Sequence, residues 1–249
     1  MNSLVKKISV FVAALSFIGV GAIASGKTLQ ISVDNANPPF MSGKGNKAEG
    51  IYPAIVKAAF AKTKFKTEIK AWPWKRLIAK IDAAEAGVAG IYKNSDREKK
   101  YDYSKQIISE KLVLFVRNDS SFSFKNISDL SGKKIGVIRG WSYGDDFDAA
   151  KKANKFKTEE AKSDSVNFKK LGSGRLDACI AIVEAGRSQL ASQNLKGKIK
   201  YLDKPLAVNP VYLTFNKKAN NKDAIAAFDK AIDGMKASGE LTKIVDSFL

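Results

Sequence analysis

Residues 90–104, GIYKNSDREKKYDYS, carry the clearest indication of how this chain folds and where it could bind a small molecule. They begin at the end of a run of small apolar residues that suits a buried strand and ends at Ile91. The polar residues Lys93 to Asp96 are typical of a helix N-terminus, and Arg97 follows one turn into that helix. A guanidinium there can hold a carboxylate by two parallel hydrogen bonds. The alternative is a surface arginine paired with an acidic neighbour in a solvated turn.

Two further groups of this stretch are expected at the carboxyl end of the strand. They are the backbone around Gly90 and the hydroxyl of Tyr92. Open α/β sheets bind their ligands at this end of the strands. We therefore predict that Gly90, Tyr92 and Arg97 are ligand-binding residues.

Residues 1–24 are predicted to be a signal peptide that is cleaved near Ser25. Lys6 and Lys7 precede an apolar run, and the residues Ala22-Ile23-Ala24 fit the small-x-small cleavage pattern. A membrane anchor is the alternative, but serine and glycine interrupt the run, which is short for a span of about 20 apolar residues. We therefore expect an exported, periplasmic protein.

The composition excludes several kinds of site. The hydrophobic fraction of 45% is that of a globular protein. The single cysteine, Cys179, permits no internal disulfide and lies in a buried-strand pattern, so we expect it in the core. There is no histidine, which excludes Ser-His and Cys-His catalytic sites and leaves a zinc site without its usual ligands. We predict no catalytic residue, no metal and no cofactor.

The formal net charge of +18 comes mostly from lysines spread along the chain. They form no arginine-rich stripe, and no nucleic-acid-binding signature accompanies them. Export also argues against a nucleic-acid partner. We interpret most of this charge as solvated helix faces, with some preference for an anionic group on the ligand.

Predicted strands and helices alternate along the chain in two βα runs, which indicates an α/β fold. The first run covers residues 25–117 and the second covers residues 118–207, while residues 208–249 return to the first. We expect two lobes, each a mostly parallel sheet flanked by helices, joined by a hinge of two crossings. This arrangement leaves a cleft that can close around a small ligand.

Two loops of the first lobe carry further candidate residues at predicted strand ends. The first holds Asp34 and Phe40, and Phe40 suits core packing as well as ligand contact. In the second, Trp74 follows Pro73 at the start of a helix, where its ring either covers a ligand or closes the rim of the core. We include all three side chains among the candidate ligand-binding residues.

The second lobe contributes Trp141, Ser142 and Glu184. Trp141 and Ser142 follow a short strand and a glycine turn, where backbone N–H groups and a helix dipole can bind an anion. The segment matches neither the dinucleotide fingerprint nor the P-loop, so we do not predict nucleotide binding. Glu184 comes directly after the strand that holds Cys179, at the same edge of the predicted sheet.

The order of these motifs resembles that of the family 3 extracellular solute-binding proteins, the periplasmic receptors that deliver polar amino acids to ABC importers. The resemblance runs from Thr28 to Phe248 and is specific because six weak motifs occur in the expected order. They are D-x-x-x-x-P-F at 34–40, P-W-x-R at 73–76, A-G-I with R-x-x-x-x-D-[FY]-S at 89–104, D-L-x-G-K-x-I-G-V-x-x-G at 129–140, L-x-x-G-R-x-D-A at 171–178 and A-I-x-x-M-x-x-S-G-E-L-x-K-I at 231–244.

The resemblance implies roles for individual residues. The family's carboxylate-binding arginine falls on Arg97, its amine-binding backbone carbonyl on Gly90, and its serine or threonine hydroxyl on Tyr92. Its second-lobe N–H donors fall near Trp141 and Ser142.

One position departs from the family pattern. The aspartate that pairs with the ligand's α-amino group falls on Ile182, which cannot take that role, and Glu184 is a carboxylate two residues further on. A buried ammonium without a counter-charge would cost several kcal/mol. The resemblance thus implies a carboxylate-bearing ligand and leaves open whether it carries an α-amino group.

Three functions are consistent with the sequence. The first is a monomeric periplasmic receptor that closes on a small solute and delivers it to an inner-membrane ABC permease. The second is a sensory protein that presents its ligand to a membrane receptor, and no sequence feature separates it from the first. The third is a dehydratase-like enzyme on the same scaffold, which would need Glu184, Asp34 or a lysine as its general acid or base.

Overall fold

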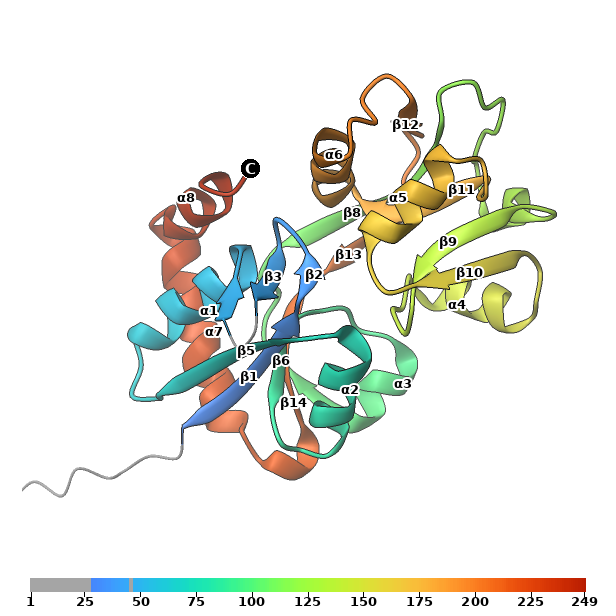
Figure 1. Ribbon diagram of the computed structural model, residues 1–249. Coiled ribbons are helices and arrows are strands. Elements are labelled where there is room, and N and C mark those ends of the chain that lie inside the picture. The colour runs from blue at the N-terminus through green and yellow to red at the C-terminus, as the bar shows by residue number, and fades with distance from the viewer. Residues whose placement is uncertain (1–27, 45–46) are drawn as a thin grey trace, which may run out of the picture.

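Figure 1 shows a computed structural model of the protein, which describes residues 28–44 and 47–249. The predicted signal peptide, residues 1–24, lies outside the described residues. Two large sheets, each flanked by helices, form two halves of the molecule (Figure 1). No helix in the described part of the chain combines the length and the apolar character needed to span a membrane.

The sheet of the first half has five strands. The interior strand β1 runs parallel to both neighbours, whereas the returning strand β14 runs antiparallel to the strands beside it. Along β1 the residues are almost all buried, as expected for a central strand of a parallel unit. The strand order is β5 (Thr67–Trp72), β1 (Leu29–Asp34), β6 (Gly87–Ile91), β14 (Tyr212–Asn216) and β7 (Tyr101–Tyr103).

The helices of the first half follow local signals in the sequence. Pro73 is the N-cap of α2, and Asn94 caps α3 by accepting a hydrogen bond of 2.9 Å from the backbone N–H of Arg97. The elements are α1 (Ile51–Ala61), α2 (Trp74–Asp82), α3 (Ser95–Lys100), the 3-10 helix η2 (Lys217–Ala219), α7 (Lys222–Ala237) and α8 (Glu240–Asp246), with a small sheet of β2 (Ala36–Asn37), β3 (Met41–Lys44) and β4 (Lys47–Glu49).

The sheet of the second half is built around the long strand β8. Strand β11 pairs with β8 on one side, and β12 and β13 pair with it in turn on the other, all antiparallel. The strands are β10 (Lys157–Ala161), β9 (Lys134–Ile138), β11 (Ala178–Ile182), β8 (Ser109–Arg117), β12 (Ile199–Tyr201) and β13 (Ala207–Pro210). The helices are η1 (Ile127–Leu130), α4 (Asp145–Lys152), α5 (Asp164–Gly172) and α6 (Val183–Ser192).

The predicted α/β class with two sheet-based lobes is confirmed, but both sheets are mixed rather than mostly parallel. Each contains three neighbouring parallel strands and one strand, β14 or β8, that runs antiparallel to all the strands it pairs with. The reason is that β14 and β8 connect the two halves. A βα crossover makes two consecutive strands of a sheet parallel. A strand whose chain arrives from the other half follows no such crossover and can run antiparallel.

The change from one half to the other also comes earlier than the predicted boundary after Arg117. Strand β8 belongs to the second sheet, and so does β13, so the sheets divide the chain at residues 104–108 and at Val211. Five consecutive residues of β8 are buried because the strand lies in the middle of its sheet. The polar residues 118–126, where we predicted the crossing, form a loop within the second half.

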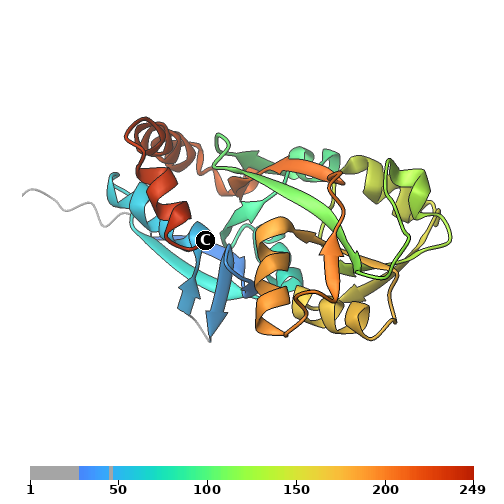
Figure 2. The ribbon, with the colours of Figure 1, turned by 90° about the horizontal axis from the view of Figure 1, so that it is seen from above.

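The two connections lie side by side (Figure 2). The N–H of Ile107 donates to the carbonyl of Val211 at 2.8 Å, and the N–H of Val211 donates to the carbonyl of Ile108 at 2.9 Å. Such a pair of short extended segments can bend together, which is how two-crossing hinges work.

Cys179 lies where the sequence predicts it. It is a free, fully buried thiol in the core of the second half, on β11. Burial raises the pKa of this thiol well above its usual range, so it remains protonated and inert.

Candidate functional site

A small cavity lies between the two halves. Its volume is about 10 Å³, and a water molecule needs about 10–15 Å³, so the halves are closed on a space of roughly one water. The first half supplies four of its lining residues and the second half three. They are Met41, Trp74, Gly90 and Tyr92, and Glu110, Trp141 and Ser142.

Two tryptophans hold the halves together at this cavity. Their rings lie 5.6 Å apart, and the Nε1 of Trp74 donates to the carbonyl of Gly140 at 2.9 Å. In return, the Nε1 of Trp141 lies 3.4 Å from Oδ2 of Asp34. Both tryptophans stand at strand-to-helix junctions, so each reaches from one sheet edge to the other. Each ring therefore contributes both apolar surface and one polar contact across the cleft.

Arg97 lies beside this cavity on α3. Its Nη1 donates to the carbonyl of Tyr92 at 3.0 Å, and the guanidinium lies 5.6 Å from the centroid of the Trp74 ring. No carboxylate of residues 28–44 or 47–249 forms an ion pair with it. Burial lowers the pKa of the guanidinium from its ordinary value, but an arginine remains charged in a protein. Its other N–H groups can therefore receive a carboxylate.

Gly90 lines the cavity with a backbone that requires glycine. Its φ is +84°, and a Cβ there would lie 2.7 Å from Cδ2 of Tyr52 and 2.9 Å from the sulfur of Met41. Close packing therefore explains why glycine occupies this position in the cavity wall.

The hydroxyl of Tyr92 donates to the carboxylate of Glu110, a residue that the sequence analysis did not select. The hydroxyl of Tyr52 donates to the same carboxylate. Glu110 is completely enclosed at the start of β8, and burial raises its pKa to about 7 although the two tyrosine hydrogen bonds oppose this shift. No sequence signal distinguishes Glu110 from its exposed neighbour Lys111, because its burial depends on the first half closing over the second.

Asp34 lies at the end of β1 and is only 3% exposed. Its Oδ1 accepts from the N–H of Ala36 at 3.0 Å, and its Oδ2 faces Trp141. Burial raises the pKa of this carboxyl to about 6, and the hydrogen bonds partly offset the effect. The structure therefore brings Asp34 to the cleft, although it does not line the cavity itself.

The turn after β9 is less suited to an anion than the sequence indicates. The N–H of Trp141 donates to the carbonyl of Ile138 at 3.2 Å, and the N–H of Tyr143 donates to Asp148 at 3.1 Å. The hydroxyl of Ser142 also donates to Asp148. The predicted anion nest is thus largely satisfied from within, and the first turn of α4 carries three aspartates. The N–H of Ser142, a residue that lines the cavity, has no acceptor among the described residues and stays a predicted donor to an anionic group.

Four of the predicted site residues do not line the cavity. They are Arg97 and Asp34, described above, and Phe40 and Glu184. Phe40 packs in the core of the first half, where its ring lies 5.8 Å from that of Tyr52. Core packing was the alternative for Phe40, and the structure follows it. Glu184 lies partly exposed in the first turn of α6 and does not line the cavity, but its negative charge contributes to raising the pKa of the cavity-lining Glu110.

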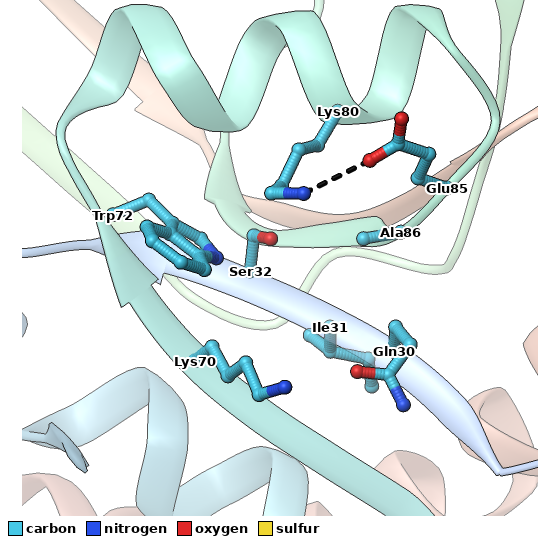
Figure 3. Close-up of a pocket in the computed structure, with 8 residues that line it drawn as sticks. All are labelled: Gln30, Ile31, Ser32, Lys70, Trp72, Lys80, Glu85 and Ala86. Atoms are coloured by element: carbon cyan, nitrogen blue, oxygen red, sulfur yellow. Dashed lines mark hydrogen bonds and ion pairs between the residues drawn. The ribbon is translucent and has the colours of Figure 1, made fainter. Parts of the chain in front are cut away.

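A second hollow, of about 190 Å³, lies in the first half between α2 and the strands β1 and β5 (Figure 3). None of the predicted site residues lines it. Its lysines already have acidic partners, since Lys80 pairs with Glu85 at 2.9 Å and Lys70 with Glu68 at 3.0 Å. We therefore place the candidate site between the halves.

Comparisons with known proteins agree with this fold. The model of the bacterial extracellular solute-binding proteins, family 3, matches residues 29–249. The L-cystine-binding protein TcyJ of Escherichia coli (strain K12) is 23% identical over 229 residues, which cover 89% of this chain and 82% of TcyJ.

Two solved structures are similar over nearly their whole length. One is the substrate-binding protein of an amino acid ABC transporter, with a TM-score of 0.74, 27% identity and coverage of 89% of this chain and 99% of that one. The other is an ancestral arginine-binding protein bound to arginine, with a TM-score of 0.76, 25% identity and coverage of 89% and 98%.

Proposed function

The chain belongs to the bacterial extracellular solute-binding proteins of family 3, and on that premise we propose that it captures an amino acid or a closely related carboxylate outside the cytoplasm and delivers it to an ABC importer. The names of its relatives support this class of solute, since one binds L-cystine and another arginine. The amino acid ABC transporter to which a third relative belongs supports the delivery step.

The observation that carries the proposal is the guanidinium of Arg97. It lies beside the cavity, one face towards Trp74, with no ion pair to any residue in the described part of the chain. A partly buried charge of this kind is stabilised by a partner, and a planar carboxylate fits its two parallel donors. The solute's carboxylate is that partner in our proposal.

Capture requires the two halves to separate and close again. The cavity has room for roughly one water, so a solute enters only when the contacts of Trp74 and Trp141 across the cleft open. The paired connections at residues 104–108 and at Val211 are the natural place for this bending. A closed state with solute would keep the tryptophan contacts or replace them with contacts to the solute.

Arg97→Ala tests the proposal directly. The purified mature protein is screened against L-amino acids by the rise in Tm, and hits are confirmed by calorimetry. We expect at least one amino acid to raise the Tm of the wild type and none to raise that of the variant. Arg76→Ala is the matched control, because Arg76 is an exposed arginine of the same half that stacks on Trp72, 4.0 Å from its ring. An Arg97→Ala protein that retains the full ligand-induced shift would overturn the assignment.

Export and delivery have separate tests. N-terminal sequencing of the protein from a periplasmic extract should give a mature chain that starts near Ser25, while an uncleaved N-terminus would contradict the predicted signal peptide. A pull-down from membrane extracts with solute present should recover a permease. Recovery of a sensory receptor in its place would favour the alternative of a ligand-presenting protein.

A further inference from the structure

Glu110 is the one carboxyl group in the wall of the cavity between the halves, among the residues that the structure describes. It is 3% exposed and forms no ion pair with residues 28–44 or 47–249. Burying a carboxyl is costly, and most such groups meet a donor or a cation. Asp164, the first residue of α5, is also buried, and no described residue donates to it, but it does not line the cavity. Glu110 is therefore the carboxyl that a captured solute meets.

Two tyrosines of the first half hold this carboxylate in place. The hydroxyl of Tyr52 on α1 donates to its Oε1, and the hydroxyl of Tyr92 after β6 donates to its Oε2. An ionised carboxylate has about four acceptor sites, so each oxygen keeps one. Tyr92 and Glu110 both border the cavity, so a donor that enters the cavity can reach the carboxylate. The two tyrosines thus orient Glu110 and leave it able to accept a hydrogen bond from a solute.

The register of the second sheet places Glu110 beside the end of β11. Ile182, the last residue of β11, pairs with Leu112, and Glu110 lies two residues before Leu112 on the same face of β8. The step from Leu112 to Glu110 leads towards the first half, because β8 follows the connection at residues 104–108. The resemblance placed an amine-binding carboxylate at Ile182, which has none. The neighbouring strand supplies a carboxyl one step nearer the first half, whereas Glu184 does not line the cavity.

Tyr92 stands between Glu110 and Arg97. Its carbonyl accepts from Nη1 of Arg97 at 3.0 Å, and its hydroxyl donates to Glu110. A single residue therefore bridges the cationic group and the carboxyl, and no ion pair joins them within the described part of the chain. A zwitterion between them gives each charge a partner, with its carboxylate on Arg97 and its ammonium on Glu110. An acid without an amine pairs Arg97 alone and leaves Glu110 without a cation.

We propose that Glu110 binds the ammonium group of the solute and selects zwitterionic amino acids over carboxylates that lack an amine. The inference rests on the proposed function and names the specificity-determining residue of that site. It also answers the question that Ile182 raised, because the charge that this position lacks comes from β8. The carboxylate of the solute then lies towards α3 and its ammonium towards the start of β8, with the side chain pointing to the remaining wall of the cavity.

The test compares each amino acid with the 2-hydroxy acid that has the same side chain, in which a hydroxyl replaces the ammonium. The probes are the protein-forming L-amino acids, L-cystine and their hydroxy acids, such as L-lactate for L-alanine and L-3-phenyllactate for L-phenylalanine. Affinities are measured by calorimetry for the full mature chain, its Glu110→Gln variant and the control Asp203→Asn, an exposed carboxyl of the same half. We expect the wild type and the control to prefer the amino acid by about 10- to 100-fold, the effect of a charge-assisted hydrogen bond, and Glu110→Gln to lose most of that preference.

The preference separates binding by Glu110 from a role in holding the halves together. Glutamine keeps one oxygen for the hydroxyls of Tyr52 and Tyr92, and the Tm without solute checks the fold of the variant. If Glu110 only ties the halves, Glu110→Gln weakens the amino acid and its hydroxy acid by the same factor. Tyr52→Phe removes one of these ties without changing the lining of the cavity, so it should keep the preference of the wild type.

The pH dependence of binding is a second readout and needs no variant. Burial raises the pKa of Glu110 to about 7, and the charge of Glu184 on α6 adds to this rise. The other titratable groups that face Glu110 are Tyr52 and Tyr92, which stay neutral because burial raises their pKa well above the usual value. The carboxylate that pairs with an ammonium therefore forms as the pH rises through about 7. The preference of the wild type for the amino acid should increase by about 10-fold or more from pH 5.5 to pH 8, and that of Glu110→Gln should not.

Each outcome decides between distinct statements. A Glu110→Gln protein that keeps the preference of the wild type overturns the role of Glu110, and a loss of preference in Glu184→Gln in its place would assign the ammonium to Glu184. A wild type that binds a hydroxy acid as tightly as the amino acid overturns this inference and leaves the capture of a carboxylate intact. A wild type that binds none of the amino acids or hydroxy acids overturns the proposed function and this inference with it.

Discussion

The two strand-to-helix turns that face each other across the cleft use their charges in opposite ways. In the first half, the turn after β6 is closed by Asn94, a neutral cap, and Arg97 beside the cavity forms no ion pair with any residue that the structure describes. In the second half, the turn after β9 is closed by Asp148, which accepts from both Ser142 and Tyr143. The difference teaches that the cationic group of this site comes from the first half, whereas the turn of the second half uses its carboxylate to hold its own polar groups. A solute with its carboxylate towards the first half matches both sides.

The largest expected effect comes from replacing the guanidinium of Arg97, which follows the turn after β6. Arg97→Lys keeps the charge but loses the planar fork, so we expect the Kd for the bound amino acid to rise about 10- to 100-fold. Calorimetry on the variant and on Arg76→Lys, its control on the outer face, measures this effect. An unchanged Kd for Arg97→Lys would mean that the side chain contributes only its charge. The two parallel hydrogen bonds of the guanidinium would then not contribute to binding.

For the turn after β9, we expect loss of the closing carboxylate to lower the stability of the protein more than its affinity for the solute. Asp148→Ala leaves the hydroxyl of Ser142 and the N–H of Tyr143 without their acceptor, and we expect the free energy of unfolding to fall by about 1–3 kcal/mol. Chemical denaturation measures the loss. Asp146→Ala, at an exposed position in the same first turn of α4, is the control and should stay close to the wild type. Equal losses in both variants would show that Asp148 does not act as the closing residue.

A third test uses pH, because the cleft holds carboxyls whose pKa values are raised. The pKa values of Glu110 and Asp164 are about 7 and that of Asp34 is about 6, all above those of the unfolded chain because of burial. The folded state therefore binds more protons, so the stability without solute should fall as the pH rises from about 4.5 to 7.5. We expect the Tm at pH 8 to lie below the Tm at pH 5.5 by about 2–4 °C or more. A loss of about 1 kcal/mol in the free energy of unfolding lowers the Tm by that amount in a chain of this size.

Glu110→Gln separates the contributions to this pH dependence. Glutamine keeps one oxygen for the hydroxyls of Tyr52 and Tyr92 and has no charge to bury. The decrease in Tm between pH 5.5 and pH 8 should be smaller in the variant than in the wild type. The same decrease in both proteins would exclude Glu110 as its source and leave the two aspartates.

The smallest expected effect concerns the side chain of Ser142, a residue whose backbone N–H the sequence analysis selected as an anion donor. Its hydroxyl is already engaged by Asp148. We therefore expect Ser142→Ala to change the Kd for the bound amino acid by less than about threefold and the free energy of unfolding by about 0.5–1.5 kcal/mol, the net value of one hydrogen bond. A loss of affinity as large as that of Arg97→Lys would show that the hydroxyl of Ser142 leaves Asp148 and contacts the solute.

Local patterns in the sequence predicted the features that depend on neighbouring residues, namely the fold class and individual helices and strands. The alternation of strand and helix signals gave the α/β class, the polar start at Asn94 gave the helix that carries Arg97, and the apolar run around Cys179 gave a core strand. Propensity, capping and periodicity act over a few residues, so they can be read without knowing the fold.

Only the tertiary structure decided which side chains are buried where the two halves meet. Glu110 and Asp164 stand in segments that look like ordinary strand and helix starts, yet both carboxyls are buried, and the hydroxyls that meet Glu110 come from the other half. The tertiary structure also places Phe40 in the core and β8 in the second sheet. The physical reason is that burial is a property of two surfaces that come together, whereas a sequence motif describes only one of them.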